Sequence, residues 1–315
     1  MTTHARVMLA GLLLACGTLA VAVGVTDDDT PAAEAKTASK GPYVALGDSY
    51  TAGPEIPDRT GSPAGCDRSD RNYPALVAAG LGLKGADFRD VSCSGAKITD
   101  LTTSQSTDDG TNPAQLKAIS SDTRLVTVGI GGNDIGFSPM IKRCVGAGAL
   151  YKLAGSGKYV SEDAPCARQY AGDSGDSGDS VGQRIDEADE RLARTLTEVR
   201  RRAPQARVYV VGYPAILPSE SAECDREMSL APGDVTFLRE TEQRLNSMLR
   251  ERAEAAGMGY VDTYTPSKGH DACSAEDTRW IEPLVPRSPA AAMHPNERGE
   301  RGMADAVLHT LRSAL

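Results

Sequence analysis

Apolar and polar residues alternate along the chain in two periods, one typical of buried strands and the other of amphipathic helices. Short aliphatic and β-branched runs predict strands at 43–46, 88–93, 124–130, 206–212 and 259–262. Apolar residues at helical spacing predict helices at 73–83, 181–202, 232–256 and 297–311, and a further helix that starts with Pro113 and runs toward Ser120. Gly257 is the residue expected just beyond the C-terminus of the helix at 232–256.

Strands that alternate with helices and are apolar on both faces predict an α/β fold. We expect a three-layer α/β/α sandwich with a central parallel five-stranded sheet. The glycine-rich turns 47–49 and 129–134 follow the first and third strands, so both lie at the carboxyl edge of the sheet, where such folds bind ligands. Residues 137–180, which contain a repeated Asp-Ser-Gly sequence, are expected to be an insertion that forms a flexible, solvated loop.

The first residues have the pattern of an export signal. An apolar run covers residues 7–25 after a short basic region, and consecutive aspartates end it. We expect residues 1–25 to be a signal peptide or an N-terminal anchor, 26–40 a linker and 41–315 the folded domain. Three alternatives stay open for the first segment: cleavage after Ala22 or near Ala35, acylation of Cys16 as a membrane-anchored lipoprotein, or an uncleaved anchor. Each places the domain outside the cytoplasm, and a secreted protein is the preferred prediction.

Charge and composition narrow the classes of partner. The 315-residue chain has 43 acidic and 34 basic residues, giving a net charge of −9. This balance opposes binding to nucleic acid, because that affinity depends on Lys and Arg meeting phosphates. Aromatic residues make up only 4%, too few for a stacking platform for bases. A chain of this size folds without a metal. We expect a monomer with no cofactor and at most transient contact with lipid surfaces.

Six of the seven cysteines lie beyond the first segment, an even number that predicts disulfides in an exported chain. They are Cys66, Cys93, Cys144, Cys166, Cys224 and Cys273. Six cysteines allow fifteen pairings, and the sequence alone does not choose among them. None forms a Cys-x-x-Cys motif or stands beside a histidine at metal-ligand spacing, so no zinc site is expected.

Ser49 is the candidate nucleophile. It directly follows the first predicted strand, where a turn exposes the hydroxyl and leaves the backbone N–H free to bind an oxyanion, although a serine there also fits a simple helix cap. Four histidines are candidate bases. His4 lies in the export segment, His309 inside the last helix and His270 in a loop. His294 follows the last strand, at the same edge as Ser49, and is the preferred base.

Four short blocks of sequence resemble those of the SGNH (GDSL) hydrolases. They occur in order at residues 47–53 (GDSYTAG), 92–96 (SCSGA), 131–134 (GGND) and 294–295 (HP). Together they span nearly all of the expected domain, and the best match is to the secreted, disulfide-bonded lipases and esterases of streptomycete type. The resemblance implies the flavodoxin-like SGNH hydrolase fold and a serine hydrolase that works through an acyl-enzyme.

The resemblance also implies roles for individual residues. Ser49 and His294 are expected to be catalytic, and the oxyanion hole to consist of the Ser49 and Gly95 N–H groups and the Asn133 amide. Cysteines of these relatives pair in sequence order, which implies the pairs Cys66–Cys93, Cys144–Cys166 and Cys224–Cys273.

One position departs from the family pattern, since the aspartate usually found three residues before the histidine is Ala291 here. The Nδ1–H group of His294 needs an acceptor to hold the tautomer in which Nε2 is free to act as a base. We expect a Ser–His dyad in which the backbone carbonyl of Ala291 or Ala292 is this acceptor. The carboxylate of Asp262, at the end of the last strand, is the alternative.

The predicted function is a secreted lipase or carboxylesterase that acts on a small ester or a lipid. The alternatives are a carbohydrate O-acetyl esterase or phospholipase of the same fold, a non-catalytic surface binding module, and a trypsin-like protease built on Ser174. Asp134 is expected to hold its own turn through backbone hydrogen bonds. Tyr50 and Trp280 are expected either to line an acyl pocket or to belong to the core.

Overall fold

The computed structural model describes residues 42–154, 163–170, 180–219 and 224–313. The expected export segment and linker, and residues 173–179 of the Asp-Ser-Gly repeat, lie outside the described residues. None of the described helices combines the length and the apolar character needed to cross a membrane.

The core is one sheet of five parallel strands, as predicted. Its strands run in the order β2-β1-β5-β6-β7, and every neighbouring pair is parallel. The strands are β1 (Tyr43–Gly47), β2 (Phe88–Asp90), β5 (Leu125–Gly129), β6 (Arg207–Val211) and β7 (Gly259–Val261). β2 is shorter than predicted, although the Val91 and Cys93 N–H groups still donate to the β1 carbonyls of Ala45 and Gly47.

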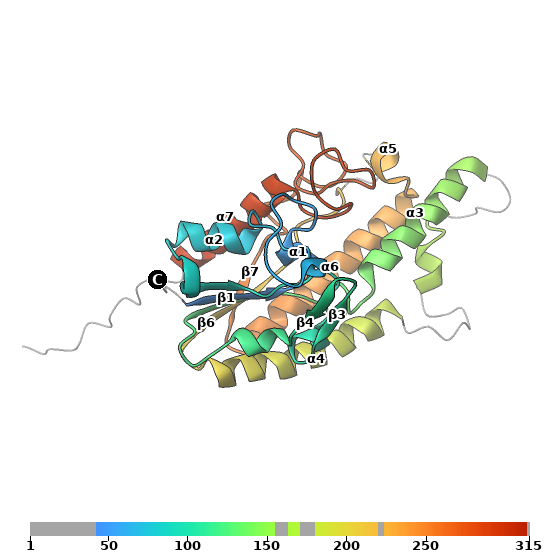
Figure 1. The fold of residues 1–315 in the computed structure, drawn as a ribbon. Coiled ribbons are helices and arrows are strands. Elements are labelled where there is room, and N and C mark those ends of the chain that lie inside the picture. Colours follow the sequence, from blue (N-terminus) through green and yellow to red (C-terminus); the bar gives the residue numbers. More distant parts are fainter. Residues whose placement is uncertain (1–41, 155–162, 171–179, 220–223, 314–315) are drawn as a thin grey trace, which may run out of the picture. The chain divides into compact units, whose positions relative to one another are not determined.

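Helices cover both faces of the sheet and complete three layers (Figure 1). Helices α2 (Tyr73–Gly80) and α7 (Glu297–Ser313) pack together on one face, while α4 (Val181–Arg202) and α6 (Pro232–Ala255) pack together on the other. Successive side chains of each strand point to opposite faces of the sheet, so they pack alternately against the two helical layers. In β1, Ala45 faces the first layer and Val44 faces the second.

Local sequence signals explain where the two long helices begin and end. Ser180 caps α4 by accepting the Gln183 N–H, and the Gln183 side chain reciprocates on the Ser180 N–H. Three arginines in the last turn of α4 complement the helix dipole. Pro232 is the first residue of α6, and Gly257, with φ 63°, lets the chain turn out of it.

The prediction of a flexible loop for residues 137–180 is wrong for much of that segment. Residues Phe137–Ala154 form helix α3, and Ala167–Tyr170 form the short 3-10 helix η5. Apolar residues at helical spacing near the start of α3 join the core beside α6, among them Met140, Ile141 and Cys144. The polar Asp-Ser-Gly repeat later in the segment favours a loop and conceals this helical signal.

The remaining elements are short. Residues 113–120, predicted as a helix, contain only the 3-10 helix η4 (Gln115–Ala118), and the hairpin of β3 (Gln105–Thr107) and β4 (Gly110–Asn112) was not predicted. The others are α1 (Ser49–Ala52), η1 (Ala64–Cys66), η2 (Gly85–Asp87), η3 (Ile98–Leu101) and α5 (Asp225–Met228).

All six cysteines of the domain are paired in the order that the family resemblance implied. The disulfides are Cys66–Cys93, Cys144–Cys166 and Cys224–Cys273. Asp234 lies beside the second pair and accepts the backbone N–H groups of Cys166 and Ala167. Cys144, Cys166 and Asp234 are the one group in the described residues with metal-ligand proximity, but both sulfurs are committed to a disulfide.

The strand order places a topological switch point at β1. The chain continues from β1 to β2 on one side, whereas β5, β6 and β7 follow on the other side. The segments after β1 and β5 therefore diverge at the carboxyl edge of the sheet, which is where α/β folds of this kind bind ligands. Ser49 follows β1 and Asn133 follows β5, so the switch point brings two candidate site residues to one place.

Candidate active site

Ser49 lies in a tight turn between β1 and the short helix α1. Asp48 caps this helix, with its Oδ1 atom accepting the Tyr50 N–H at 3.0 Å. A Cβ atom at Gly47 would lie 2.1 Å from the Thr51 hydroxyl oxygen and 2.6 Å from the Gly129 carbonyl oxygen, so only glycine allows so sharp a turn. The Ser49 side chain is thereby presented at the strand end, where the residue is 9% exposed.

The structure brings His294 onto Ser49 from the loop that precedes α7. The Nε2 atom of His294 lies 2.8 Å from the Ser49 Oγ atom. Its Nδ1 atom lies 2.8 Å from the carbonyl oxygen of Ala292. Since a carbonyl only accepts hydrogen bonds, Nδ1 carries the proton, and Nε2 of the neutral ring accepts from the serine hydroxyl.

A buried carboxylate fixes the loop that carries His294. The Glu282 N–H donates to the His294 carbonyl at 3.0 Å. The Glu282 side chain accepts the Asn296 amide at 2.8 Å, the Arg287 N–H at 2.7 Å and the Ser288 hydroxyl. Burial alone would raise the pKa of Glu282, but these hydrogen bonds hold the pKa below its usual value. Glu282 is therefore ionised at neutral pH and holds the loop as a hydrogen-bond acceptor.

The surroundings of His294 favour the neutral imidazole. Burial lowers the pKa of His294, the hydrogen bond to Ala292 opposes this, and the positive charge of Lys142 lowers it further. Tyr50 covers the imidazole at a ring-centroid distance of 4.9 Å, and its hydroxyl donates to the Met293 carbonyl at 2.5 Å. The ring is thus held in the form that can take a proton from Ser49.

Tyr213, at the end of β6, connects the turns after β1 and β5. Its hydroxyl donates to the Asp48 carboxyl at 2.5 Å and accepts the Gly132 N–H at 2.8 Å. Burial raises the pKa of Asp48 to about 7, against the lowering effect of the Tyr213 hydrogen bond. Burial and the neighbouring Asp48 raise the pKa of Tyr213 well above its usual value, so the phenol stays protonated and donates.

The three groups expected to bind an oxyanion have hydrogen-bonding capacity to spare. Within the described residues, the N–H groups of Ser49 and Gly95 donate no hydrogen bond to another protein atom. The Asn133 amide donates one of its two N–H bonds to the Ala96 carbonyl at 2.9 Å, which leaves the other N–H for a ligand. The residue after it, Asp134, accepts the Ile98 N–H at 3.0 Å.

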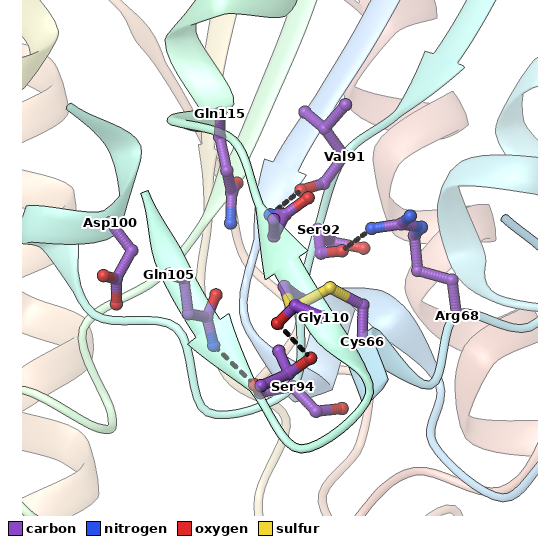
Figure 2. The surroundings of a disulfide bond; sticks show 12 residues. Cys66, Arg68, Val91, Ser92, Ser94, Asp100, Gln105, Gly110 and Gln115 are labelled. Carbon is purple, nitrogen blue, oxygen red and sulfur yellow. Dashed lines mark hydrogen bonds between the residues drawn. A yellow bond between two sulfur atoms is a disulfide. The ribbon is translucent and has the colours of Figure 1, made fainter. Parts of the chain in front are cut away.

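The loop that carries Gly95 is fastened on several sides, as Figure 2 shows. The Cys66–Cys93 disulfide joins it to η1. The Arg68 guanidinium donates to the Ser92 carbonyl at 2.6 Å, and the Gln105 amide of the β3–β4 hairpin donates to the Ser94 carbonyl at 2.8 Å. The backbone N–H of Gly95 is therefore held in place before any ligand arrives, as electrostatic preorganisation requires.

A narrow cleft lies against Ser49. Asp48, Ser49, Tyr50, Gly132 and Asn133 line its polar end. Its other walls come from α3, α6 and the loops after β6 and before α7, namely Phe137, Ser138, Ile141, Tyr213, Ile216, Glu242, Leu245 and Met293. Most of these side chains are apolar, which suits the acyl part of an ester.

Several sequence expectations need correction. Asp262 accepts the N–H and hydroxyl of Thr265 and lies 3.6 Å from Arg250, so Ala292, not Asp262, provides the acceptor for His294. The Asp134 N–H does close its own turn, by donating to the Gly131 carbonyl at 3.1 Å, but the Asp134 carboxylate also holds the neighbouring loop at Ile98, which was not expected.

The other candidate residues lie away from the cleft. His270 lies 2.7 Å from the Thr278 carbonyl and stacks on Trp280, and the Trp280 ring packs against Gly302 of α7. Tyr50 does line the cleft. His309 lies on the exposed side of α7, and Ser174 lies outside the described residues.

Three residues of the site were missed from the sequence. Tyr213, Glu282 and Glu242 act through contacts made only in the folded chain. Glu242 did have a sequence signal, because it falls on the apolar stripe of α6 with Leu238 and Leu245.

Comparisons with known proteins agree with this geometry. The model of the GDSL-like lipase/acylhydrolase family matches residues 45–301. The chain is 41% identical over 309 residues to Lipase 2 of Streptomyces coelicolor, covering 97% of both chains. Among solved structures, it resembles the extracellular lipase of Streptomyces rimosus (TM-score 0.65, 27% identity, 85% of this chain and 98% of that one). It also resembles phospholipase A1 of Streptomyces albidoflavus NA297 (TM-score 0.63, 28% identity, 88% and 100%).

Proposed function

The chain belongs to the GDSL-like lipase/acylhydrolase family and is a carboxylic ester hydrolase, and we propose that it acts through a Ser49–His294 dyad and an acyl-enzyme. The observation that carries this proposal is the pair of 2.8 Å contacts of His294, one to the Ser49 hydroxyl and one to the Ala292 carbonyl. A serine hydroxyl becomes nucleophilic when a base, itself held by a third group, lies within hydrogen-bond reach.

In the first half of the reaction, the Ser49 Oγ atom attacks the carbonyl carbon of the ester while His294 Nε2 takes the serine proton. The carbonyl oxygen becomes an oxyanion, bound by the Ser49 N–H, the Gly95 N–H and the second N–H of Asn133. The tetrahedral intermediate collapses as His294 passes its proton to the leaving alcohol, and the acyl group stays on Ser49.

In the second half, a water molecule gives a proton to His294 Nε2 and attacks the acyl-enzyme. The same three donors bind the second oxyanion. Collapse of this intermediate releases the carboxylic acid, and His294 returns the proton to Ser49. Throughout, the Ala292 carbonyl keeps the ring oriented. As a neutral acceptor it stabilises the imidazolium less than a carboxylate would, so most of the rate enhancement comes from positioning and the oxyanion donors.

The substrate class is an ester of a small molecule or a lipid, and a phospholipid is the second candidate because the phospholipase A1 structure matches this chain closely. The end of α3 favours contact with a lipid surface. Its residues Leu150 and Leu153 are 68% and 85% exposed, whereas Phe137 and Ile141, near its start, line the cleft. Exposed apolar side chains on a helix whose first turns line the cleft suit transient contact with lipid.

Secretion into an oxidising environment is part of the proposal. Three disulfides among the described residues support it, because such bonds persist outside the cytoplasm. The Streptomyces rimosus lipase that this chain resembles is also an extracellular protein.

A fluorophosphonate probe tests the proposed nucleophile. The oxygen of an activated serine attacks the phosphorus of such a probe and displaces fluoride, which leaves the serine phosphonylated. Peptide mapping is expected to find the label on Ser49 in the wild type and in Ser138→Ala, whose replaced serine lies in the same cleft. The Ser49→Ala protein is expected to stay unlabelled. A label on another serine, or none on the wild type, would refute the proposal.

A further inference from the structure

A carboxyl group lies in the otherwise apolar part of the cleft. Glu242 projects from the middle of α6 and lines the same cleft as Ser49. It is 1% exposed, so the carboxyl is buried in the wall of that cleft. The mechanism of ester hydrolysis proposed above makes no use of it.

One oxygen of this carboxyl is not used by the protein. The Oε2 atom accepts the Ile216 N–H at 3.3 Å. The Oε1 atom is buried and has no hydrogen-bond partner within the described residues, and Glu242 has no ion pair with any of them. A buried polar atom without a partner costs free energy, so a ligand atom that pairs with it is favoured.

The surroundings determine which form of the carboxyl is present. Burial raises the pKa of Glu242 well above its usual value, the Ile216 hydrogen bond opposes this, and the neighbouring Asp271 raises it further. Tyr50, which also lines the cleft, stays a neutral phenol because burial and the nearby Glu242 raise its pKa. Burial therefore favours the neutral acid, with Oε2 as the acceptor of the Ile216 N–H and an O–H group on the unpaired Oε1.

The wall around this O–H group cannot satisfy it. Ile141, Ile216, Leu245 and Met293 line the cleft nearby and carry no oxygen or nitrogen in their side chains. A plain alkyl chain in the cleft leaves the O–H unpaired, whereas a chain with an oxygen at the right depth accepts it. A site built around a buried hydrogen-bonding group discriminates strongly against a ligand that lacks the matching group.

We propose that Glu242 forms a polar subsite for the acyl group, which selects esters whose acyl chain bears an acceptor oxygen, such as an oxo group, over esters with a plain alkyl chain. The proposal rests on the proposed hydrolase function, since it takes the cleft beside Ser49 as the acyl site. It assigns the part of the cleft beside Glu242 to the acyl group because that group stays attached to Ser49 after the alcohol has left.

The rival interpretation is purely structural, with Glu242 serving only to hold the Ile216 N–H. A structural role predicts that removing the carboxyl lowers the melting temperature and the hydrolysis of all esters by the same factor. A subsite predicts that the ratio between two esters changes. The ratio is therefore the quantity that separates the two roles.

The experiment compares ethyl hexanoate with a series of ethyl oxohexanoates, in which the oxo group occupies successive carbons beyond the α-carbon. Acid release gives kcat/KM for each ester. In the wild type, at least one oxo ester is expected to exceed ethyl hexanoate by about tenfold or more, the scale of one buried hydrogen bond. Glu242→Leu should lose this preference. Glu242→Gln, which keeps a donor and an acceptor, should retain it within about threefold.

Two controls limit the interpretation. Glu240→Leu changes an exposed glutamate on the same helix and should leave the ratio unchanged. Hexyl acetate and its oxohexyl counterparts carry the oxygen in the alcohol, and Glu242→Leu should not alter their ratio. A wild-type ratio near one for every oxo ester, or a preference that survives in Glu242→Leu, would overturn the subsite. A Glu242-dependent preference for the oxohexyl acetates would overturn its assignment to the acyl group.

A binding measurement keeps the subsite testable if the hydrolase proposal fails. In the Ser49→Ala protein, calorimetry measures the affinity for the same intact esters without turnover. Tighter binding of an oxo ester, lost when Glu242→Leu is added, would support the subsite even if the wild type hydrolysed no ester. Equal affinities would overturn the subsite whether or not the wild type were an active hydrolase.

Discussion

The Nε2 atom of His294 lies 2.8 Å from the hydroxyl oxygen of Ser49, although 245 residues separate the two in the chain. The parallel sheet accounts for this meeting. Ser49 follows the first strand of the sheet and His294 lies in the loop after the last, and the carboxyl ends of parallel strands share one edge. Glu282 and Tyr50 then fix the final approach of the imidazole.

His294→Ala is expected to lower kcat/KM on a soluble short-chain ester by about a thousandfold or more, because the serine then has no base. The matched change, His270→Ala, should cost less than about tenfold in kcat/KM, since His270 contacts Thr278 and Trp280 away from the cleft. It should instead lower the melting temperature. Equal losses of activity in the two variants would show that the base is wrongly assigned.

The pKa of His294 should lie below 6.5, the ordinary value for histidine, because burial and then the positive charge of Lys142 lower it. The imidazole should therefore stay neutral, and able to act as a base, at pH values somewhat below 6.5. The acidic limb of the kcat/KM profile reports this pKa in the free enzyme. Lys142→Gln removes a positive charge that opposes protonation, so the limb should move to higher pH. Lys117→Gln changes an exposed lysine of η4; it is the control and should leave the limb in place. A shift of the limb to lower pH in Lys142→Gln would contradict the electrostatic account.

Asp48 should make the folded protein less stable as pH rises. Its pKa is about 7 in the folded chain against 3.8 for an ordinary aspartate, so the folded state binds more protons between these values. The contribution of Asp48 to stability is therefore full below about pH 4 and lost as pH rises through about 7. Thermal melting across this range should show that the melting temperature of Asp48→Asn rises relative to that of the wild type as pH rises.

Asp122→Asn is the control for this measurement, because Asp122 is exposed. Its melting temperature should keep a constant offset from that of the wild type. An offset for Asp48→Asn that also stayed constant between about pH 4 and about pH 7 would show that the buried carboxyl is ionised in the folded protein.

The dyad should tolerate loss of the carboxylate at the end of β7. Asp262 contacts Thr265 and Arg250, while the Ala292 carbonyl holds the Nδ1–H of His294. Asp262→Asn is therefore expected to keep kcat/KM within about tenfold of the wild-type value, small beside the usual contribution of acid–base catalysis. Thermal melting controls for folding. A folded variant that lost a thousandfold would reveal a triad with Asp262 as its third member.

The parts of the structure that sequence patterns predicted are those with a local cause. Aliphatic and β-branched runs predicted the five strands, and the apolar spacing of 181–202 predicted α4 with its observed bounds. The placement of Ser49 and His294 at one edge followed from their positions after strands. The polar repeat within 137–180 concealed α3, whose first turns are stabilised by packing on α6 that the sequence does not display.

Side-chain contacts between distant segments were the least predictable features. Whether Ala291 or Ala292 holds the imidazole depends on the positive φ of Met293, a conformation that the surrounding loop imposes. Asp134 contacts Ile98, a residue far from it in the chain. Trp280 packs on α7 because Gly302 leaves room for the indole.

The most direct test of the proposed mechanism is kcat/KM of Ser49→Ala on a soluble short-chain ester, measured beside the wild type and with thermal melting to verify folding. Because the hydroxyl is the attacking group, the folded variant is expected to have no turnover beyond about a thousandth of the wild-type value. A folded Ser49→Ala protein that hydrolysed the ester at the wild-type rate would contradict the assignment of Ser49 as the nucleophile, and with it the acyl-enzyme mechanism.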